Sequence, residues 1–146
     1  MSNFKEIVTK AIIGKCKKKV ISSYDIECDE KPNTILGCWV INHSFRGVNN
    51  LGKVNVSGSF DVNVWYSYDN DRLTDVVREN NKYREVIHMR EVDTDDEEII
   101  VRSLKQPNCL KVDIVDGGIK YNIEKELGIE LVSNVKVKIE TSDDED

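Results

Sequence analysis

The sequence predicts an all-β fold, an antiparallel β-sandwich of about eight strands. Three observations lead to this fold class. Apolar and polar residues alternate over one long stretch, 54–68, and turn-forming residues recur along most of the chain. In addition, no long segment has an unambiguous helical periodicity. Strands separated by regular turns are typical of sandwiches and barrels, and strands with one apolar face favour two packed sheets.

The stretch 54–68 is the element around which we expect the other strands to assemble. A strand sends alternate side chains to opposite faces, and here every even position except one carries a large apolar side chain. The exception is Gly58, and glycine inside a strand often marks a bulge or a close approach of another backbone. Trp65 is the only large apolar residue at an odd position, so it is expected on the polar face.

The N-terminal part contains one ambiguous segment and one clear strand. Residues 4–13 have apolar side chains at helical spacing, but their β-branched content suits a strand, which we favour. Residues 16–26 would continue this strand or pair beside it. A polar turn is expected at 29–33, because Pro32 cannot donate to a central ladder. The apolar run 34–44 fits a strand that is buried on both faces or lies at a seam between sheets.

A hairpin is expected after the central strand. Residues 69–71 (Asp-Asn-Asp) are a turn signal, and residues 73–77 and 83–92 would form the returning strand. Alternation fails at 78–82, which predicts a bulge or bend there. Five of the six residues in 93–98 are acidic, so repulsion between like charges favours a solvated, mobile loop.

The C-terminal part supplies a second clear hairpin. Residues 99–104 form a short predicted strand, which Pro107 interrupts. A type I′ turn at Asp116 and Gly117 would then place three pairs of apolar residues opposite one another. These pairs are Ile114 with Ile119, Val112 with Tyr121, and Leu110 with Ile123.

Two further strands are expected at 126–132 and 135–139, with a turn at Ser133 and Asn134. A single β-sandwich domain would therefore cover residues 1–141. Residues 142–146 form a short acidic C-terminal tail that we expect to be disordered.

Length and charge exclude several classes of partner. The chain has 146 residues, a net charge of −6 and a pI of about 5.0, which argues against nucleic acid or an anionic membrane as the main partner. It has no apolar run long enough for a transmembrane segment. The first residues, MSNFKEIVTK, lack the apolar core of a secretory signal, so we expect synthesis in a cytoplasm.

Cysteine and histidine content predicts no metal, no cofactor and no enzyme. No CxxC pair is present, and thiols in a reducing cytoplasm are expected to be free. A Cys–His dyad is the only candidate for chemistry, and the spacing of Cys38 and His43 would put them on opposite faces of a strand. Whether Cys109 approaches His88 cannot be judged from the sequence. The four cysteines are Cys16, Cys28, Cys38 and Cys109.

The informative features concern association with other molecules. Trp65 is either covered by a loop or a neighbouring side chain, or it anchors a protein–protein contact, where tryptophan is enriched. A basic cluster is either a solvated strand end or loop, or a partner for acidic segments, 93–98 and 143–146, of a neighbouring subunit. Such charge pairs would orient subunits more than they stabilise them. The basic cluster consists of Lys15, Lys17, Lys18 and Lys19.

Three segments resemble a known family. TILGCWVINH at 34–43, FDVNVWYSY at 60–68 and QPNCLKV at 106–112 look like the outer spore coat morphogenetic protein CotE family of endospore-forming bacteria. The segments occur in the expected order, and an acidic C-terminus follows. The resemblance covers nearly the whole chain. It implies a non-enzymatic structural protein that is made in the mother-cell cytoplasm, encases the forespore in the outer coat and self-associates.

The resemblance also implies partners. Members of the family are expected to dock on inner-layer coat morphogenetic proteins and to recruit outer coat proteins. Recruitment is associated with the acidic C-terminal region, and self-association and spore targeting with the central and N-terminal parts. The tail here is much shorter than the long acidic tails of the family. Recruitment maps onto Asp143, Asp144, Glu145 and Asp146.

We therefore expect a β-sandwich that forms homo-oligomers and a virion-like lattice scaffold on the spore. The alternative is a small-ligand or glycan-binding β-sandwich module, with Trp65 and Trp39 on a binding face.

Overall fold

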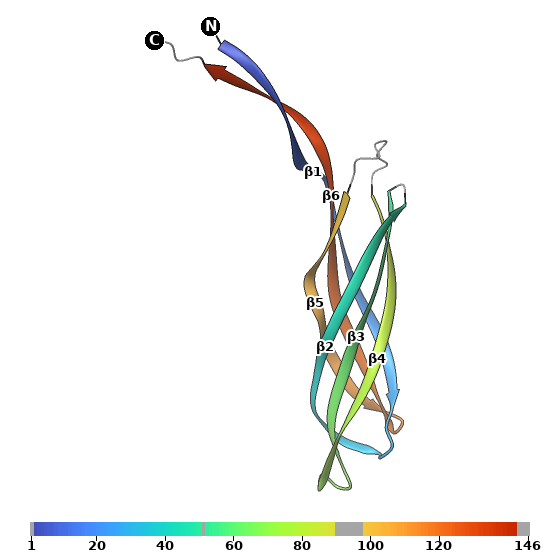
Figure 1. Cartoon of the computed structure of the whole chain (residues 1–146). Coiled ribbons are helices and arrows are strands. Elements are labelled where there is room, and N and C mark those ends of the chain that lie inside the picture. The colour runs from blue at the N-terminus through green and yellow to red at the C-terminus, as the bar shows by residue number, and fades with distance from the viewer. Residues whose placement is uncertain (1, 51, 90–97, 143–146) are drawn as a thin grey trace.

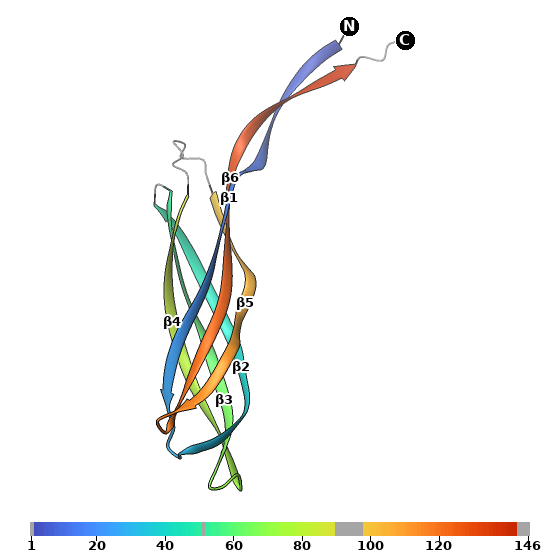
Figure 2. The same cartoon turned by 180° about the vertical axis from the view of Figure 1, so that it is seen from behind.

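The computed structural model describes residues 2–50, 52–89 and 98–142, which form two antiparallel sheets (Figures 1 and 2). No helix occurs in these ranges, so the all-β prediction is confirmed. The predicted number of strands, about eight, was wrong, because the described residues form six. The strands are β1 (Ser2–Glu27), β2 (Pro32–Asn50), β3 (Lys53–Tyr68), β4 (Leu73–His88), β5 (Glu98–Val115) and β6 (Gly118–Ser142).

There are fewer strands because segments predicted as separate run on as one. β1 includes both 4–13 and 16–26, which confirms the strand interpretation of the first segment. β6 passes through the predicted turn at Ser133 and Asn134, because both residues pair with β1 there. β5 contains Pro107 at a shift in the β5–β6 ladder, where a missing N–H removes no regular ladder bond.

The bulge predicted at 78–82 in the returning strand was also wrong. β4 pairs with β3 residue by residue from Leu73 to His88. The polar residues of this segment fit a regular strand because their side chains have hydrogen-bond partners. Asn80 Nδ2 donates to Asp61 Oδ1 at 2.7 Å, and Asn81 Nδ2 donates to the Tyr121 hydroxyl at 2.7 Å.

One sheet has the strand order β2-β3-β4 and the other β1-β6-β5, so β3 and β6 are the middle strands. β1 and β6 pair along their whole length, which brings the two ends of the described chain, residues 2 and 142, side by side (Figure 1). Within the described residues, β5 accompanies β6 as far as Val132. Beyond that point, residues 2–12 and 133–142 form a two-stranded ribbon that projects from the other strands (Figure 2). We call it the terminal ribbon.

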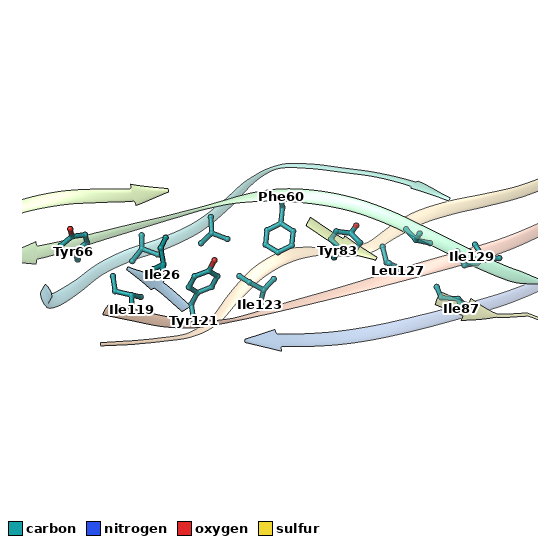
Figure 3. Packing of buried hydrophobic residues seen from close by; sticks show 14 residues of the cluster. Ile26, Phe60, Tyr66, Tyr83, Ile87, Ile119, Tyr121, Ile123, Leu127 and Ile129 are labelled. Carbon is teal, nitrogen blue, oxygen red and sulfur yellow. The ribbon is translucent and has the colours of Figure 1, made fainter. Parts of the chain in front are cut away.

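A single core cluster takes side chains from both sheets (Figure 3). Most even positions of β3 are buried, as the alternation predicted, and they meet odd positions of β6. Removing this apolar surface from water is the main source of stability for the arrangement. The fully buried side chains include Val54, Val56, Phe60, Val62, Val64 and Tyr66 of β3, and Ile119, Tyr121, Ile123, Leu127 and Ile129 of β6.

Gly58 makes room for an aromatic ring and also for the predicted close approach of another backbone, that of Ser44. Tyr83 of β4 lies directly opposite Gly58 in the ladder. A methyl group on Gly58 would collide with the end of the Tyr83 ring and would stand 2.7 Å from the carbonyl oxygen of Ser44. Tyr83 therefore packs over Gly58, where its hydroxyl lies 2.6 Å from Nε2 of His43.

A charged group also lies in the core. Lys125 of β6 is only 2% exposed, and its Nζ lies 3.1 Å from Oε1 of Glu85 on β4. The same ammonium stands 4.2 Å from the centre of the Tyr83 ring. Lys18 of β1 approaches the other oxygen of Glu85 at 3.3 Å and donates to the carbonyl oxygen of Val86. Glu85 on β4 thus forms ion pairs with β1 and β6, two strands of the opposite sheet.

The β5–β6 hairpin follows the predicted turn and most of the predicted register. Asp116 and Gly117 both have positive φ angles, 48° and 80°, as a type I′ turn requires. Ile114 lies opposite Ile119, and Val112 lies opposite Tyr121. The third predicted pair was wrong, because the ladder shifts between Cys109 and Lys111 and places Cys109 opposite Ile123 in place of Leu110.

Cys38 of β2 and Cys109 of β5 form a disulfide, so the prediction of four free thiols was wrong for this pair. The two residues are 71 positions apart, and only the packing of β2 against β5 brings them together. Cys16 and Cys28 are free, and burial raises the pKa of the Cys28 thiol. The disulfide joins one edge strand of each sheet.

We expect Gly58→Ala to lower the free energy of unfolding by about 1–3 kcal/mol, because the added methyl must displace Tyr83 or the Ser44 backbone. Gly37→Ala is the matched control, since its new Cβ would meet no atom closer than 3.6 Å. Urea denaturation of both variants measures the difference. Equal effects would contradict the role given to Gly58.

We expect Glu85→Ala to lower the free energy of unfolding by about 3–5 kcal/mol, because Lys125 would keep a buried charge without its carboxylate. The double variant Glu85→Ala/Lys125→Met should regain most of this loss, since methionine fits an apolar position. Thermal and urea denaturation provide the comparison. A double variant no more stable than the single one would show that the ion pair is not the reason.

Candidate functional site

The outer face of the β2-β3-β4 sheet carries both tryptophans of the chain. Trp65 stands opposite Gly37 on β2 and Val76 on β4, and Trp39 is two residues further along β2 on the same face. Both indoles lie over Gly37. From the place where a Cβ of Gly37 would stand, the nearest ring atoms of Trp39 and Trp65 are 3.6 and 3.9 Å away. We call Trp39, Trp65 and Val76 the tryptophan face.

The tryptophan face is open to solvent in the described structure. Trp39 and Trp65 are each 42% exposed, and Val76 is exposed as well. Neither a loop nor a neighbouring side chain of the described residues covers Trp65 completely. The remaining indole surface is available for a contact, and the interface role of Trp65 stays a prediction.

Fixed polar groups continue the same face towards the middle of the sheet. Arg78 Nε donates to Asn63 Oδ1 at 2.7 Å, and Asn63 lies between Trp39 and Arg78 in the ladder. Asp61 accepts hydrogen bonds from Asn42 Nδ2 at 2.9 Å and from Asn80 Nδ2 at 2.7 Å. These bonds lower the pKa of the Asp61 carboxyl. The face therefore combines an aromatic surface with oriented polar groups.

The basic cluster divides between the two faces of β1. Lys15, Lys17 and Lys19 alternate with Lys18, which points towards Glu85 and the core. Lys19 Nζ lies 2.8 Å from Glu124 Oε1, and Lys105 Nζ lies 3.0 Å from Glu124 Oε2. Both hydrogen bonds lower the pKa of the Glu124 carboxyl, and the pair raises the pKa of Lys19.

Lys18 and Lys19 therefore already have carboxylate partners inside the chain. Lys15 and Lys17 instead line a groove of about 450 Å³ on the outer face of the β1-β6-β5 sheet, with Leu104 over Gly128. Contact between the basic cluster and a neighbouring subunit stays a prediction. Of its expected acidic partners, residues 93–97 and 143–146 lie outside the described residues. The recruitment role of Asp143, Asp144, Glu145 and Asp146 is untested for the same reason.

The Cys–His dyad is not available. Cys38 and Cys109 are joined to each other, and His43 has other partners: its Nδ1 lies 2.8 Å from Gln106 Oε1, and its Nε2 faces Tyr83. The prediction that Cys38 and His43 lie on opposite faces was wrong. The β2–β3 pairing is irregular between Ile41 and Ser44, and Asn42 has a φ of 57° there. His43 therefore points towards β5, on the same side of β2 as Cys38.

Within residues 2–50, 52–89 and 98–142, no group of three or more His, Cys, Asp or Glu side chains is arranged to hold a metal ion. In the same ranges the structure has no helix of the length and apolarity that a membrane crossing requires.

Comparison with known families identifies the chain. The outer spore coat protein E (CotE) family matches residues 3–146, essentially the whole chain. The chain belongs to the CotE family. The resemblance carried by the segments at 34–43, 60–68 and 106–112 is thereby confirmed. No curated protein and no solved structure matches it.

Membership in the CotE family makes this a spore coat protein and implies a place in the outer coat. The family match covers the tryptophan face, the core and the terminal ribbon together. It assigns no role to a particular residue, so the geometry must indicate which surfaces make contacts.

Sequence reasoning found the outward position of Trp65 but not the approach of both indoles to Gly37. Alternation in β3 was enough for the first, whereas the second depends on the irregular register of β2 between Ile35 and Gly37. The burial of Lys125 was also missed. The one available signal was its odd position between Ile123 and Leu127, the same parity as the apolar residues of β6.

We expect Trp65→Ala to weaken self-association while leaving the melting temperature nearly unchanged, because the indole contributes to an exposed face rather than to the core. Leu110→Ala is a control for loss of an exposed apolar side chain on the other sheet. Sedimentation velocity and thermal denaturation of both variants give the two readouts. A large loss of stability with intact oligomers would refute the interface role.

Proposed function

We propose that this chain is a non-enzymatic morphogenetic protein that self-assembles into a scaffold around the forespore. It is made in the mother-cell cytoplasm and becomes part of the outer coat. There it contacts inner-layer coat morphogenetic proteins and recruits outer coat proteins. Family membership supports the coat location, and the surface of the molecule supports the assembly role.

The observation that carries the assembly role is the exposure of large apolar side chains away from the core. Single exposed apolar residues are ordinary, but groups of them mark interaction sites. Trp39 and Trp65 form one group on the outer face of the β2-β3-β4 sheet. Phe4, Val8 and Ile12 form another on the terminal ribbon, where the first two are each 63% exposed.

The architecture supports the same role. The two sheets, with their shared core and the disulfide between β2 and β5, suggest a rigid two-layer block of the sandwich type. Its edge strands β1 and β4 pair on one side only within the described residues. Unpaired strand edges invite pairing with another chain unless they are covered. A block with open edges and apolar outer faces is suited to building a lattice.

Charged groups on the surface would help to orient neighbouring subunits. Lys15 and Lys17 at the groove have no carboxylate partner within the described residues, and the chain carries acidic segments elsewhere. If these groups meet between subunits, such pairs would guide docking and weaken as salt is raised.

The alternative is a glycan-binding module, and one observation favours it. Both indoles approach Gly37, and the oriented polar groups of Asn63 and Asp61 lie on the same sheet. Aromatic faces with a few well-placed polar groups are typical of small-ligand sites. The two functions make opposite predictions about association.

We expect the purified chain to form large particles whose size grows with protein concentration. Size-exclusion chromatography with light scattering over a hundredfold concentration range, followed by electron microscopy, measures this. A chain that stays monomeric throughout would overturn the proposal. A monomer whose tryptophan fluorescence is quenched by an oligosaccharide would support the glycan-binding module instead.

A further inference from the structure

The terminal ribbon has fewer neighbouring strands than the rest of the described structure. It has only two strands, residues 2–12 of β1 and 133–142 of β6, and neither has a second strand partner within the described residues. A two-stranded ribbon in water is marginally stable on its own. Its side chains include exposed apolar residues on both strands, among them Phe4, Val8 and Ile139. Such a ribbon gains stability if another strand pairs along its edge.

One face of β1 in the ribbon is complementary to the same face read in reverse. On this face the even positions are Phe4, Glu6, Val8, Lys10 and Ile12, all of them exposed. The order is therefore aromatic, acidic, aliphatic, basic, aliphatic. If a second copy of β1 pairs antiparallel with the twofold axis at Val8, Phe4 faces Ile12 and Glu6 faces Lys10. Each pairing occurs twice by symmetry, and Val8 faces itself.

Other registers of β1 on itself are worse. With the axis at Ile7, Glu6 faces Val8 and Lys10 faces Phe4. With the axis at Thr9, Glu6 faces Ile12 and Lys10 faces Val8. Axes at Glu6 or Lys10 oppose like charges. Opposite charges and apolar pairs stabilise directly opposed positions, and like charges destabilise them. The register centred on Val8 is the one that satisfies all five positions.

The free edge of β6 is less suited to pairing with itself. Lys136 and Lys138 lie near the middle of this edge, on either side of Val137. With the axis at Val137 the two lysines face each other. With the axis at Lys136 or Lys138 a lysine faces its own copy. An axis at Ile139 would place Lys138 opposite Glu140 but leave Lys136 without an acidic partner, whereas the axis at Val8 opposes Glu6 to Lys10 at both symmetric positions. The β1 edge is therefore the favoured one.

We propose that the β1 edge of the terminal ribbon pairs antiparallel with the same edge of a second copy, centred on Val8, to form a four-stranded sheet in the order β6-β1-β1-β6. The proposal rests on the proposed function, self-assembly, and specifies one contact through which two copies associate. The interface is isologous, as in most homodimers. It buries the exposed Phe4, Val8 and Ile12 in cross-strand pairs.

Lys10 has one existing partner that the contact must accommodate. Its Nζ lies 3.1 Å from Glu98 Oε1 within the chain, and both side chains are more than 60% exposed. An exposed ion pair of this kind contributes little to stability. Lys10 can therefore turn to Glu6 of the second copy at small cost.

Charge reversal tests the register. Glu6→Lys places lysine opposite Lys10 at two symmetric positions, and we expect the dissociation constant of the dimer to rise about tenfold. Lys10→Glu should have a similar effect. The double variant Glu6→Lys/Lys10→Glu restores both opposite-charge pairs, and its dissociation constant should return to within about threefold of the unmodified chain. Analytical ultracentrifugation at low salt measures all four proteins.

Rescue in the double variant can only come from the second copy. Inside one chain, residue 6 lies opposite Lys138 and Lys10 pairs with Glu98, so both reversals are unfavourable there, singly or together. Circular dichroism and thermal denaturation check that each variant is folded. Lys111→Glu, an exposed lysine on β5, is the matched control and should leave the dissociation constant unchanged.

A cross-link provides a second measurement that does not depend on charge. In a Cys16→Ser/Cys28→Ser background, Val8→Cys should form a symmetric disulfide dimer on mild oxidation, because position 8 faces itself. Thr9→Cys should not, because position 9 would face position 7. Dimers from both variants, or from neither, would overturn the register.

The outcomes separate this inference from the proposed function. If the unmodified chain never associates, the scaffold function fails. If it associates but neither charge reversal nor Val8→Cys behaves as described, the scaffold function stands and the β1 contact is wrong. Pairing of β1 with β6 of another copy would appear as a cross-link between Val8→Cys and Val137→Cys in a mixture, which also overturns the proposal.

Discussion

The fold depends on one packing arrangement, the burial of the even positions of β3 against the odd positions of β6. Because strand side chains alternate strictly, this choice decides what every other residue of the two middle strands can do. With Val64 and Tyr66 inside, Trp65 must lie outside. With Ile123 and Leu127 inside, Glu124 and Glu126 are directed towards the lysines of β1 and β5. The outer surfaces are thus a consequence of the core.

Polar contacts across the core determine how the two sheets are placed relative to each other. Asn81 donates to the Tyr121 hydroxyl, and Glu85 binds both Lys18 and Lys125. Apolar packing is tolerant of small slips, whereas a buried charge without its partner is costly. Burial raises the pKa of Tyr83 to about 12, so its hydroxyl stays protonated beside His43. Because removing one partner of such a contact is costly, these groups disfavour arrangements of the two sheets that separate them.

Much of the fold could be predicted because it depends on patterns of residues that are close together in the chain. The period of two along 54–68, the type I′ turn at Asp116 and Gly117, and the space over Gly58 all follow from short-range chemistry. What could not be predicted depends on residues far apart in the chain. Ser133 and Asn134 look like a turn until β1 pairs with them, and Cys38 meets Cys109 only because β2 packs on β5. The outward position of Trp65 belongs to the first kind, and the approach of Trp39 and Trp65 to Gly37 belongs to the second.

The pairing of β1 with β6 from one end to the other has a practical consequence. Residues 2 and 142 lie opposite each other at the outer end of the terminal ribbon (Figure 1). A peptide, enzyme or fluorophore joined to either end of the described chain would therefore leave from the same point, away from the two-sheet body. For work that seeks to decorate spores, the two ends offer one shared attachment point rather than two separate ones.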